Sequence, residues 1–464
     1  MHLQPADLEK TISLRHTLHR CPELFMHEKK TSAILQQFLR DNTRLEICQR
    51  DGWFYAVKKA GPDQCQSRAG LAAQPEGNLQ PARCQQAGCP SPAPGTSAPI
   101  AFRADMDALP IPETIDLPYG SQNEGVSHKC GHDGHCAALC GLALSLDQME
   151  TTRDVYLIFQ PGEEIGAGAL VCRDLITEKG ISEIYAFHNL GGYPEGSLVY
   201  RKGLTQPASE GLRICLTGKT SHASAPKKGN NPAGVLAKIV LAAQNLNVFP
   251  RSAPEAESQR HAVASAALEP PQPADDHSQP TDHYSQSADH HPQSPNDYPQ
   301  PADDQPQSMR LCTITGIRLG DGDFGISPGE GEVCMTLRAE AEEDMQDMEE
   351  SILRFARDKA AEAGLEMQYS IHDRFPETRN HDACLARVLD AAERIPLKKP
   401  AIPMRELWRA SEDFGYYLKT CPGAMFYIGN GENYPALHTT GYDFNDRILE
   451  TAVDLFLELV SPDL

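Results

Sequence analysis

The segment His-Lys-Cys-Gly-His-Asp-Gly-His at residues 128–135 contains the side chains of this sequence that are best suited to bind a metal. Cys130 and His132 are two positions apart, so in an extended or turn conformation they can face the same way and ligate adjacent ions. A thiolate beside an imidazole suits zinc, manganese, nickel or cobalt rather than magnesium or calcium. Alone, however, such a pair fits a structural role equally well.

A pair of adjacent carboxylates, Glu163 and Glu164, follows the apolar run 155–159. In an extended chain neighbouring side chains project to opposite sides, so one carboxylate can bind metal while the other accepts a proton from the attacking water. A positioned general base that accepts a proton from water raises the rate of hydrolysis by roughly 10²- to 10⁴-fold. Solvated glutamate pairs are common at helix starts, but the position after an apolar strand favours a functional role.

Two histidines complete the set of candidate ligands. His188 directly follows the apolar stretch 184–187, and His438 lies in a polar segment near the C-terminus. Taken singly, either residue is more often a hydrogen-bonded structural histidine than a metal ligand. Ligands of open parallel sheets gather outside the carboxyl ends of the strands, and the polar motifs fall just after predicted strands.

The elements that must position these side chains alternate between strands and helices. Strands are predicted at 99–102, 155–159, 184–187 and 424–428, with one or two more within 44–59. Helices are predicted at 5–20, 28–39, 137–149, 167–175, 382–392, 412–418 and 446–460. This alternation is typical of an α/β domain with a mostly parallel sheet flanked by helices.

A second pattern begins near Leu212. It predicts four strands, at 213–217, 312–318, 332–338 and 367–372, and two helices, at 232–246 and 345–363. These elements indicate a smaller α+β unit, a four-stranded sheet with two helices on one face.

Two segments of biased composition stand outside these elements. Residues 61–98 are rich in Gln, Gly, Pro, Ala and Ser, and we interpret them as a flexible insertion whose three cysteines lack a fourth ligand for zinc. Residues 254–308 contain a seven-residue repeat over 274–308. Its prolines and missing apolar positions exclude a coiled coil and predict disorder.

Composition limits the compartment and the partners. The formal net charge of −22 argues against nucleic acid as a partner, because phosphate binding needs a basic face. No stretch of about eighteen apolar residues predicts a membrane-spanning helix. Without a secretory signal, the 14 scattered cysteines are expected to be reduced, which indicates a cytoplasmic protein.

Six motifs in the same order resemble the M20 family of metallopeptidases, and more narrowly its amidohydrolase branch of hippurate hydrolase, auxin-conjugate hydrolases and N-acyl amino-acid deacylases. The resemblance covers nearly the whole chain except the two insertions. The motifs are Arg-Ala-Asp-Met-Asp-Ala-Leu-Pro (103–110), Cys-Gly-His-Asp-Gly-His (130–135), Gln-Pro-Gly-Glu-Glu (160–164), Phe-His-Asn (187–189), Ser-Glu-Asp-Phe-Gly (411–415) and Leu-His-Thr-Thr-Gly-Tyr-Asp-Phe-Asn-Asp (437–446).

The resemblance implies a catalytic α/β domain, residues 1–208 and 375–464, interrupted by a lid domain, residues 209–374. It also implies two divalent metal ions, held by Cys130, His132, Glu164, His188 and His438.

The same resemblance assigns roles to further residues. Glu163 would be the general base, and Asp105 would hold a ligand imidazole, as such histidines generally need. His222, on the lid, would reach the scissile carbonyl only on closure. His135 and Asp133 are expected in supporting roles rather than as ligands.

The sequence departs from the family where Gly325 stands in place of an asparagine that helps to grip the substrate. Arg338 is then the candidate for holding a substrate carboxylate. We expect hydrolysis of the amide bond of a small N-acyl amino acid or related conjugate, with no nucleic-acid or membrane partner and with a homo-oligomer left open.

Two alternatives remain open. One is a dipeptidase or aminopeptidase of the wider M20 group, disfavoured by Cys-Gly-His in place of a motif whose shared ligand is Asp. The other is a non-catalytic binding protein, disfavoured because neither Glu163 nor any of the five ligands is missing.

Overall fold

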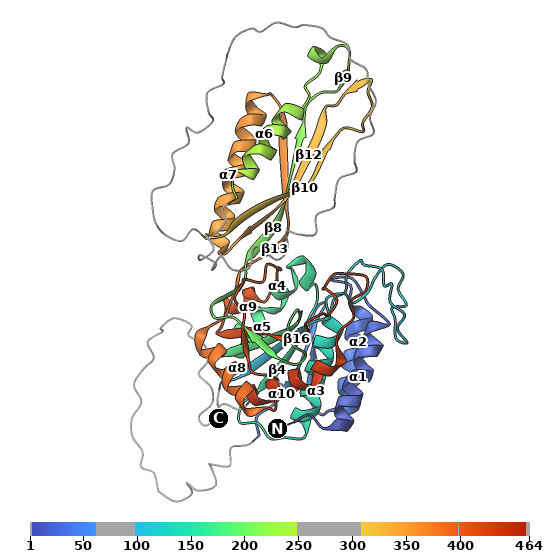
Figure 1. Ribbon diagram of the computed structural model, residues 1–464, viewed down its shortest axis with the longest axis vertical. Coiled ribbons are helices and arrows are strands. Elements are labelled where there is room, and N and C mark those ends of the chain that lie inside the picture. Colours follow the sequence, from blue (N-terminus) through green and yellow to red (C-terminus); the bar gives the residue numbers. More distant parts are fainter. Residues whose placement is uncertain (1, 62–97, 248–307, 398, 461–464) are drawn as a thin grey trace, which may run out of the picture. The chain divides into compact units, whose positions relative to one another are not determined.

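The computed structural model describes residues 2–61, 98–247, 308–397 and 399–460 (Figure 1). One compact unit comprises residues 1–247 and 310–464, and the second, residues 248–309, lies almost entirely outside the described ranges. The insertions predicted at 61–98 and 254–308, the seven-residue repeat included, also lie almost wholly outside them.

An eight-stranded sheet forms the centre of the larger unit, in the order β1-β2-β4-β3-β5-β16-β6-β15. Its strands are β1 (Glu46–Gln49), β2 (Phe54–Lys58), β3 (Ile100–Asp105), β4 (Val155–Gln160), β5 (Glu183–Gly191), β6 (Leu198–Tyr200), β15 (Ile402–Pro403) and β16 (Gly423–Gly431). The central strands β4, β3, β5 and β16 run parallel, whereas β1, β2 and β6 each join an antiparallel pair. The prediction of a mostly parallel sheet flanked by helices is confirmed.

Helices cover both faces of this sheet, which explains why the central strands are apolar along nearly their whole length (Figure 1). One face carries α1 (Pro5–His19), α2 (Lys29–Asn42), α3 (His132–Asp147), α8 (Asp382–Arg394) and α10 (Leu449–Val460). The other carries α4 (Gly168–Cys172), α5 (Asp174–Lys179) and α9 (Gly415–Leu418). Within the described ranges, no helix combines the length and apolar character needed to cross a membrane.

A separate four-stranded antiparallel sheet has the order β10-β12-β8-β13. Its strands are β8 (Ala208–Thr217), β10 (Arg310–Leu319), β12 (Glu330–Ala339) and β13 (Glu366–Phe375). Helices α6 (Ala233–Gln244) and α7 (Glu342–Glu362) lie side by side on one face and share an apolar core with it (Figure 1). The predicted four strands and two helices are therefore confirmed.

Short elements complete the described part of the fold. Two two-stranded sheets pair β9 (Ser221–His222) with β11 (Ile326–Ser327), and β7 (Leu204–Gln206) with β14 (Thr378–Arg379). The 3₁₀ helices are η2 (Glu163–Ile165), η3 (Pro226–Lys228) and η4 (Asp446–Ile448).

Four elements differ from the sequence predictions. Helix α3 begins at His132 rather than at 137, because Gly131 adopts a left-handed φ of 105° and ends the preceding turn there. Strand β5 extends to Gly191 because it pairs with β16 along its length, so His188 lies inside the strand rather than after it. Residues 167–175 belong to two short helices instead of one, and the helix predicted at 412–418 begins at Gly415.

Gly134 allows the first turn of α3 to pack directly on Phe444. A Cβ at this position would lie 2.3 Å from Phe444 Cδ2, closer than real Cβ contacts allow. This close approach places residues 130–135 against the segment that contains His438.

We therefore predict that Gly134→Ala lowers the free energy of unfolding by about 1–3 kcal/mol, the usual cost of overpacking a core. Gly234→Ala is the matched control, since a Cβ there meets no atom within 4 Å and alanine favours helix. Guanidinium unfolding of both variants measures the difference, and equal stability of the two would refute the packing argument.

Candidate metal centre

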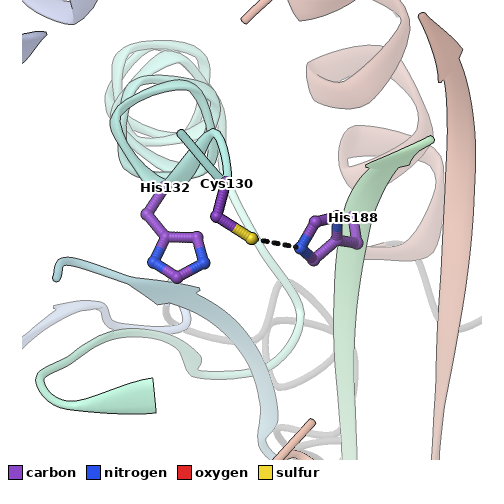
Figure 2. Close-up of side chains that lie close together, drawn as sticks. All are labelled: Cys130, His132 and His188. Atoms are coloured by element: carbon purple, nitrogen blue, oxygen red, sulfur yellow. Dashed lines mark hydrogen bonds between the residues drawn. The ribbon is translucent and has the colours of Figure 1, made fainter. Parts of the chain in front are cut away.

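The five side chains predicted to bind metal lie close together at the carboxyl edge of the parallel strands. They come from four places in the fold: the start of α3 (Cys130 and His132), η2 after β4 (Glu164), the inside of β5 (His188) and the loop after β16 (His438). Figure 2 shows Cys130 and His132 extending from the start of the helix, with the Cys130 sulfur directed at the ring of His188 on the neighbouring strand.

The distances make Cys130 the shared member of the cluster. Its Sγ lies 3.4 Å from His188 Nε2 and 3.4 Å from His438 Nε2. Glu164 Oε1 lies 3.5 Å from His438 Nε2 and 3.8 Å from His132 Nε2. Two groups of ligand atoms therefore meet at one sulfur, with His132 and His188 in one group and Glu164 and His438 in the other.

The polar atoms of this cluster are arranged as a metal site requires. His132 Nε2 and Glu164 Oε1 are buried and have no hydrogen-bond partner. The other ring nitrogen of His132 donates to the Asp107 carbonyl at 2.9 Å, and His188 Nδ1 donates to the Asn189 carbonyl at 2.8 Å. Metal-binding imidazoles are held in this way, with one nitrogen fixed by an acceptor and the other free for the ion. The side chains present therefore fit divalent cations.

Asp105, predicted to hold a ligand imidazole, holds His135 instead, which is not one of the five candidate ligands, whereas Asp107 holds the ligand His132. Asp105 Oδ1 accepts a hydrogen bond from His135 Nδ1 at 2.6 Å, and Asp105 Oδ2 lies 3.7 Å from His132 Nε2. The residue that orients the His132 ring is Asp107, through its carbonyl and through Oδ1 at 3.2 Å. Sequence reasoning missed Asp107, although both aspartates stand in the same Arg-Ala-Asp-Met-Asp motif.

The carboxylate pair does not have the extended conformation that the sequence suggested. Glu163 and Glu164 form a 3₁₀ turn after Gly162, whose φ is 56°. Glu28 accepts the Gly162 N–H at 2.7 Å, and Asp107 Oδ2 accepts the Glu164 N–H at 2.9 Å. Because of this turn the two carboxylates converge, each 3.8 Å from His132 Nε2, instead of projecting to opposite sides.

A second layer of buried charge lies behind Glu163. Arg103, fully buried, donates to Asp105 at 2.7 Å and to Glu412 and Asp413 at 2.9 Å each. Burial, followed by the charge of Glu412, raises the pKa of Glu163 well above its usual value, and burial raises the pKa of Asp413 to about 7. The single positive charge of Arg103 thus does not balance the negative charge of the carboxylates around it, so the binding of further cations here would be favourable.

Protons and metal ions compete for the ligands. Burial disfavours charge on His132, but Asp105 and Asp107 outweigh it and raise its pKa to about 10. Burial, reinforced by Glu164, raises the pKa of the Cys130 thiol well above its usual value. A bound divalent cation reverses both tendencies, because a coordinating thiol is deprotonated and a coordinating imidazole is neutral.

A cavity of about 790 Å³ opens over the cluster, a size that suits a small molecule. Glu163 and four of the five candidate ligands line it, whereas the fifth, His132, is fully buried. Other parts of its wall are formed by Leu190, Ser209, Arg338, Trp408, Ser411 and Tyr434.

Arg338 is the cation of this cavity wall. Its Nη1 donates to the Arg409 carbonyl and to Ser411 Oγ, both at 3.0 Å, and Ser411 Oγ lies 2.6 Å from Ser209 Oγ. Across the described ranges the partners of the Arg338 guanidinium are this carbonyl and this hydroxyl rather than a carboxylate, and burial lowers its pKa. The guanidinium is thus available to an anionic group in the cavity.

The structure does not bring His222 to the cluster. It lies exposed in β9, where Ile326 of β11 is its pairing partner, and its Nδ1 accepts the Ser224 N–H at 3.1 Å. Gly325 is its neighbour, since the Gly325 carbonyl accepts the Ala223 N–H at 2.9 Å. His222 therefore lies in a two-stranded sheet with Gly325 directly before its second strand, and neither residue is among those that line the cavity.

The remaining histidines of the motif have other surroundings. His135 contacts Asp105 and Asn189, and His128 is buried with neither ring nitrogen bonded. Burial lowers the pKa of His128 to about 4. Neither belongs to the groups that share Cys130.

Comparison with known proteins identifies the family of this chain. The sequence profile described as peptidase family M20/M25/M40 matches residues 101–461. An N-acetylcysteine deacetylase of Bacillus subtilis is 25% identical over 97% of this chain and 96% of its own, and a hippurate hydrolase of Campylobacter jejuni is 26% identical over 96% and 94%. A crystal structure described as a dinuclear metal-binding M20 peptidase of Bacillus subtilis superposes with a TM-score of 0.67, at 23% identity, over 98% of each chain.

We predict that chelation of divalent ions lowers the melting temperature, because it leaves the buried carboxylates uncompensated. Free metal at a hundredfold its Kd stabilises a protein by about 2.7 kcal/mol per site. His132→Ala should reduce the difference in melting temperature between chelated and metal-loaded protein, whereas His222→Ala should leave this difference unchanged. Identical melting of chelated and loaded wild-type protein would contradict a metal site here.

Proposed function

Because the chain belongs to peptidase family M20/M25/M40, we propose that it is a metal-dependent amidohydrolase that cleaves the amide bond of N-acyl amino acids or related conjugates. The observation that carries this proposal is the convergence of Cys130, His132, Glu164, His188 and His438 beside Glu163, in a cavity that also contains Arg338. The relatives named as an N-acetylcysteine deacetylase and a hippurate hydrolase support the substrate class.

Two divalent cations, zinc, manganese, nickel or cobalt, would be held by Cys130, His132, Glu164, His188 and His438. When bound, such ions polarise a carbonyl oxygen and make water a good nucleophile near neutral pH. The protein contributes the orientation of the ligands: Asp107 fixes the ring of His132 and, through its other oxygen, the backbone of Glu164. The same carboxylate therefore sets the position of two ligands from different elements.

Glu163 would move the proton. Its Oε2 lies 3.8 Å from His132 Nε2, next to the ligand cluster, and its side chain lines the cavity. We assign to it the removal of a proton from water as the water oxygen bonds to the amide carbon. It then passes that proton to the nitrogen as the C–N bond breaks, which yields a carboxylic acid and an amine without a covalent intermediate.

Arg338 would recognise the carboxylate of the amino-acid part. A guanidinium fits a carboxylate with two parallel hydrogen bonds, and Arg338 Nη1 is already fixed by Ser411 and the Arg409 carbonyl. This assignment explains how an anionic substrate could be held although Gly325 replaces the usual asparagine.

We further propose that residues 209–374 act as a lid on a catalytic domain of residues 1–208 and 375–464. The four-stranded sheet, with its own apolar core, supports this division. On closure of the lid, His222 would contact the scissile carbonyl and stabilise the negative charge that develops there.

We predict that Glu163→Gln lowers kcat by roughly 10²- to 10⁴-fold, because glutamine cannot accept the proton. Turnover of N-acetyl, N-benzoyl and indole-acetyl amino acids by the metal-loaded variant provides the measurement, with metal content as a check that the site is filled. Glu178→Gln, at an exposed glutamate paired with Arg50, is the matched control and should retain activity. Full activity of Glu163→Gln would eliminate the proposed role.

Arg338→Ala should raise KM for N-acyl amino acids by roughly 10- to 100-fold, the loss expected for a hydrogen bond to a charged group. The same substrates with a methylated carboxyl group should show little difference between wild type and variant. Steady-state kinetics on the matched free acids and esters tests this. An equal rise in KM for the free acids and for the esters would mean that Arg338 supports the structure of the cavity and does not bind the substrate carboxylate.

A further inference from the structure

Lys129, the residue before Cys130, has a fully buried side chain. Its ammonium donates to Glu113 Oε1 at 2.5 Å and to the Tyr442 carbonyl at 2.7 Å. Its own carbonyl accepts the N–H of His438 at 2.8 Å. A single residue thus holds the segment 438–442 at two points, through its side chain and through its backbone.

The segment that Lys129 holds carries the candidate ligand with the least support from regular structure. His438 belongs to no helix or strand, its side chain is half exposed, and its φ of 60° is left-handed. Left-handed backbone costs a non-glycine residue roughly 1–2 kcal/mol, so neighbouring contacts must maintain it. The other four candidate ligands lie on α3, η2 and β5 or directly before α3.

The chemistry of Lys129 also argues for a specific role. Removal of an ammonium from water costs several kcal/mol unless it is paired and hydrogen-bonded, whereas an apolar side chain would fill the same space at no such cost. The partner carboxylate, Glu113, is itself fixed by His19 Nε2 at 2.9 Å and by the Ser121 N–H at 2.8 Å. Lys129 therefore has a rigid anchor on one side and the His438 segment on the other.

We infer that Lys129 is a positioning residue for His438, and that it sets the distances of 3.4 Å to Cys130 Sγ and 3.5 Å to Glu164 Oε1. The inference rests on the proposed function in one respect, that His438 is a metal ligand. Its consequence is selective. Loss of Lys129 weakens the binding of the cation held by His438, Cys130 and Glu164, and it leaves the affinity for the cation near His132 and His188 unchanged.

The test is a titration of the full, metal-stripped chain with Co²⁺, followed by the thiolate-to-cobalt absorption that reports Cys130 and by the number of ions bound. We compare wild type, Lys129→Met, which has a similar length and no charge, and Lys129→Arg, which restores charge and donors. Lys359→Met, at a lysine that pairs with Glu362 on α7, is the matched control.

For Lys129→Met we expect one of the two Co²⁺ ions to bind roughly 10- to 100-fold more weakly, the usual effect of changing a residue that supports a ligand. Lys129→Arg should recover most of that affinity, and the control should match wild type. Wild-type affinity for both ions in a folded Lys129→Met variant, or an equal loss for both ions, would overturn the inference.

Should Lys129→Met not fold, Lys129→Gln replaces it, since it keeps a donor for the Tyr442 carbonyl. Failure of both variants to fold would assign Lys129 to the fold alone and would also overturn the inference. Failure of wild type to bind Co²⁺ is a different result, because it contradicts the proposed function itself.

Discussion

The burial of many carboxylates around one guanidinium is the constraint on which the rest of the site depends. Arg103 joins Asp105, Glu412 and Asp413 in a layer closed to solvent, and each of those groups would be costly to bury alone. The elements that carry them must therefore be held in fixed register. The negative charge that Arg103 leaves unbalanced next to Glu163 also explains why this edge of the sheet suits cations.

Local pattern was sufficient to predict most of the framework. The apolar run at 155–159 becomes the buried strand β4, and the alternating residues 213–217 become part of β8, with its inner face on α6 and α7. Both follow from the burial of one or both faces of a sheet. The proximity of Cys130 to His188 was also expected, because both were placed near the carboxyl edge of the sheet.

Other features depend on contacts that a linear pattern does not contain. Glu412 meets Arg103 although some 300 residues separate them, and the role of Asp107 depends on the direction in which its carbonyl points. The turn of Glu163 and Glu164 is set by acceptors on two distant segments, at Glu28 and Asp107. Sequence spacing alone favoured an extended pair, since it does not show which backbone N–H groups find such partners.

The position of His438 along the chain has a consequence for biosynthesis. Translation produces Cys130 and His188 early, whereas His438 follows only after the four-stranded sheet and the last parallel strand, β16, have been made. A nascent polypeptide on the ribosome therefore contains the thiol of Cys130 and the imidazole of His188 before the proposed ligand His438 has been made. With His438 as a ligand, as proposed, the complete metal site would form only late in maturation, when the C-terminal segment docks on the residues made earlier.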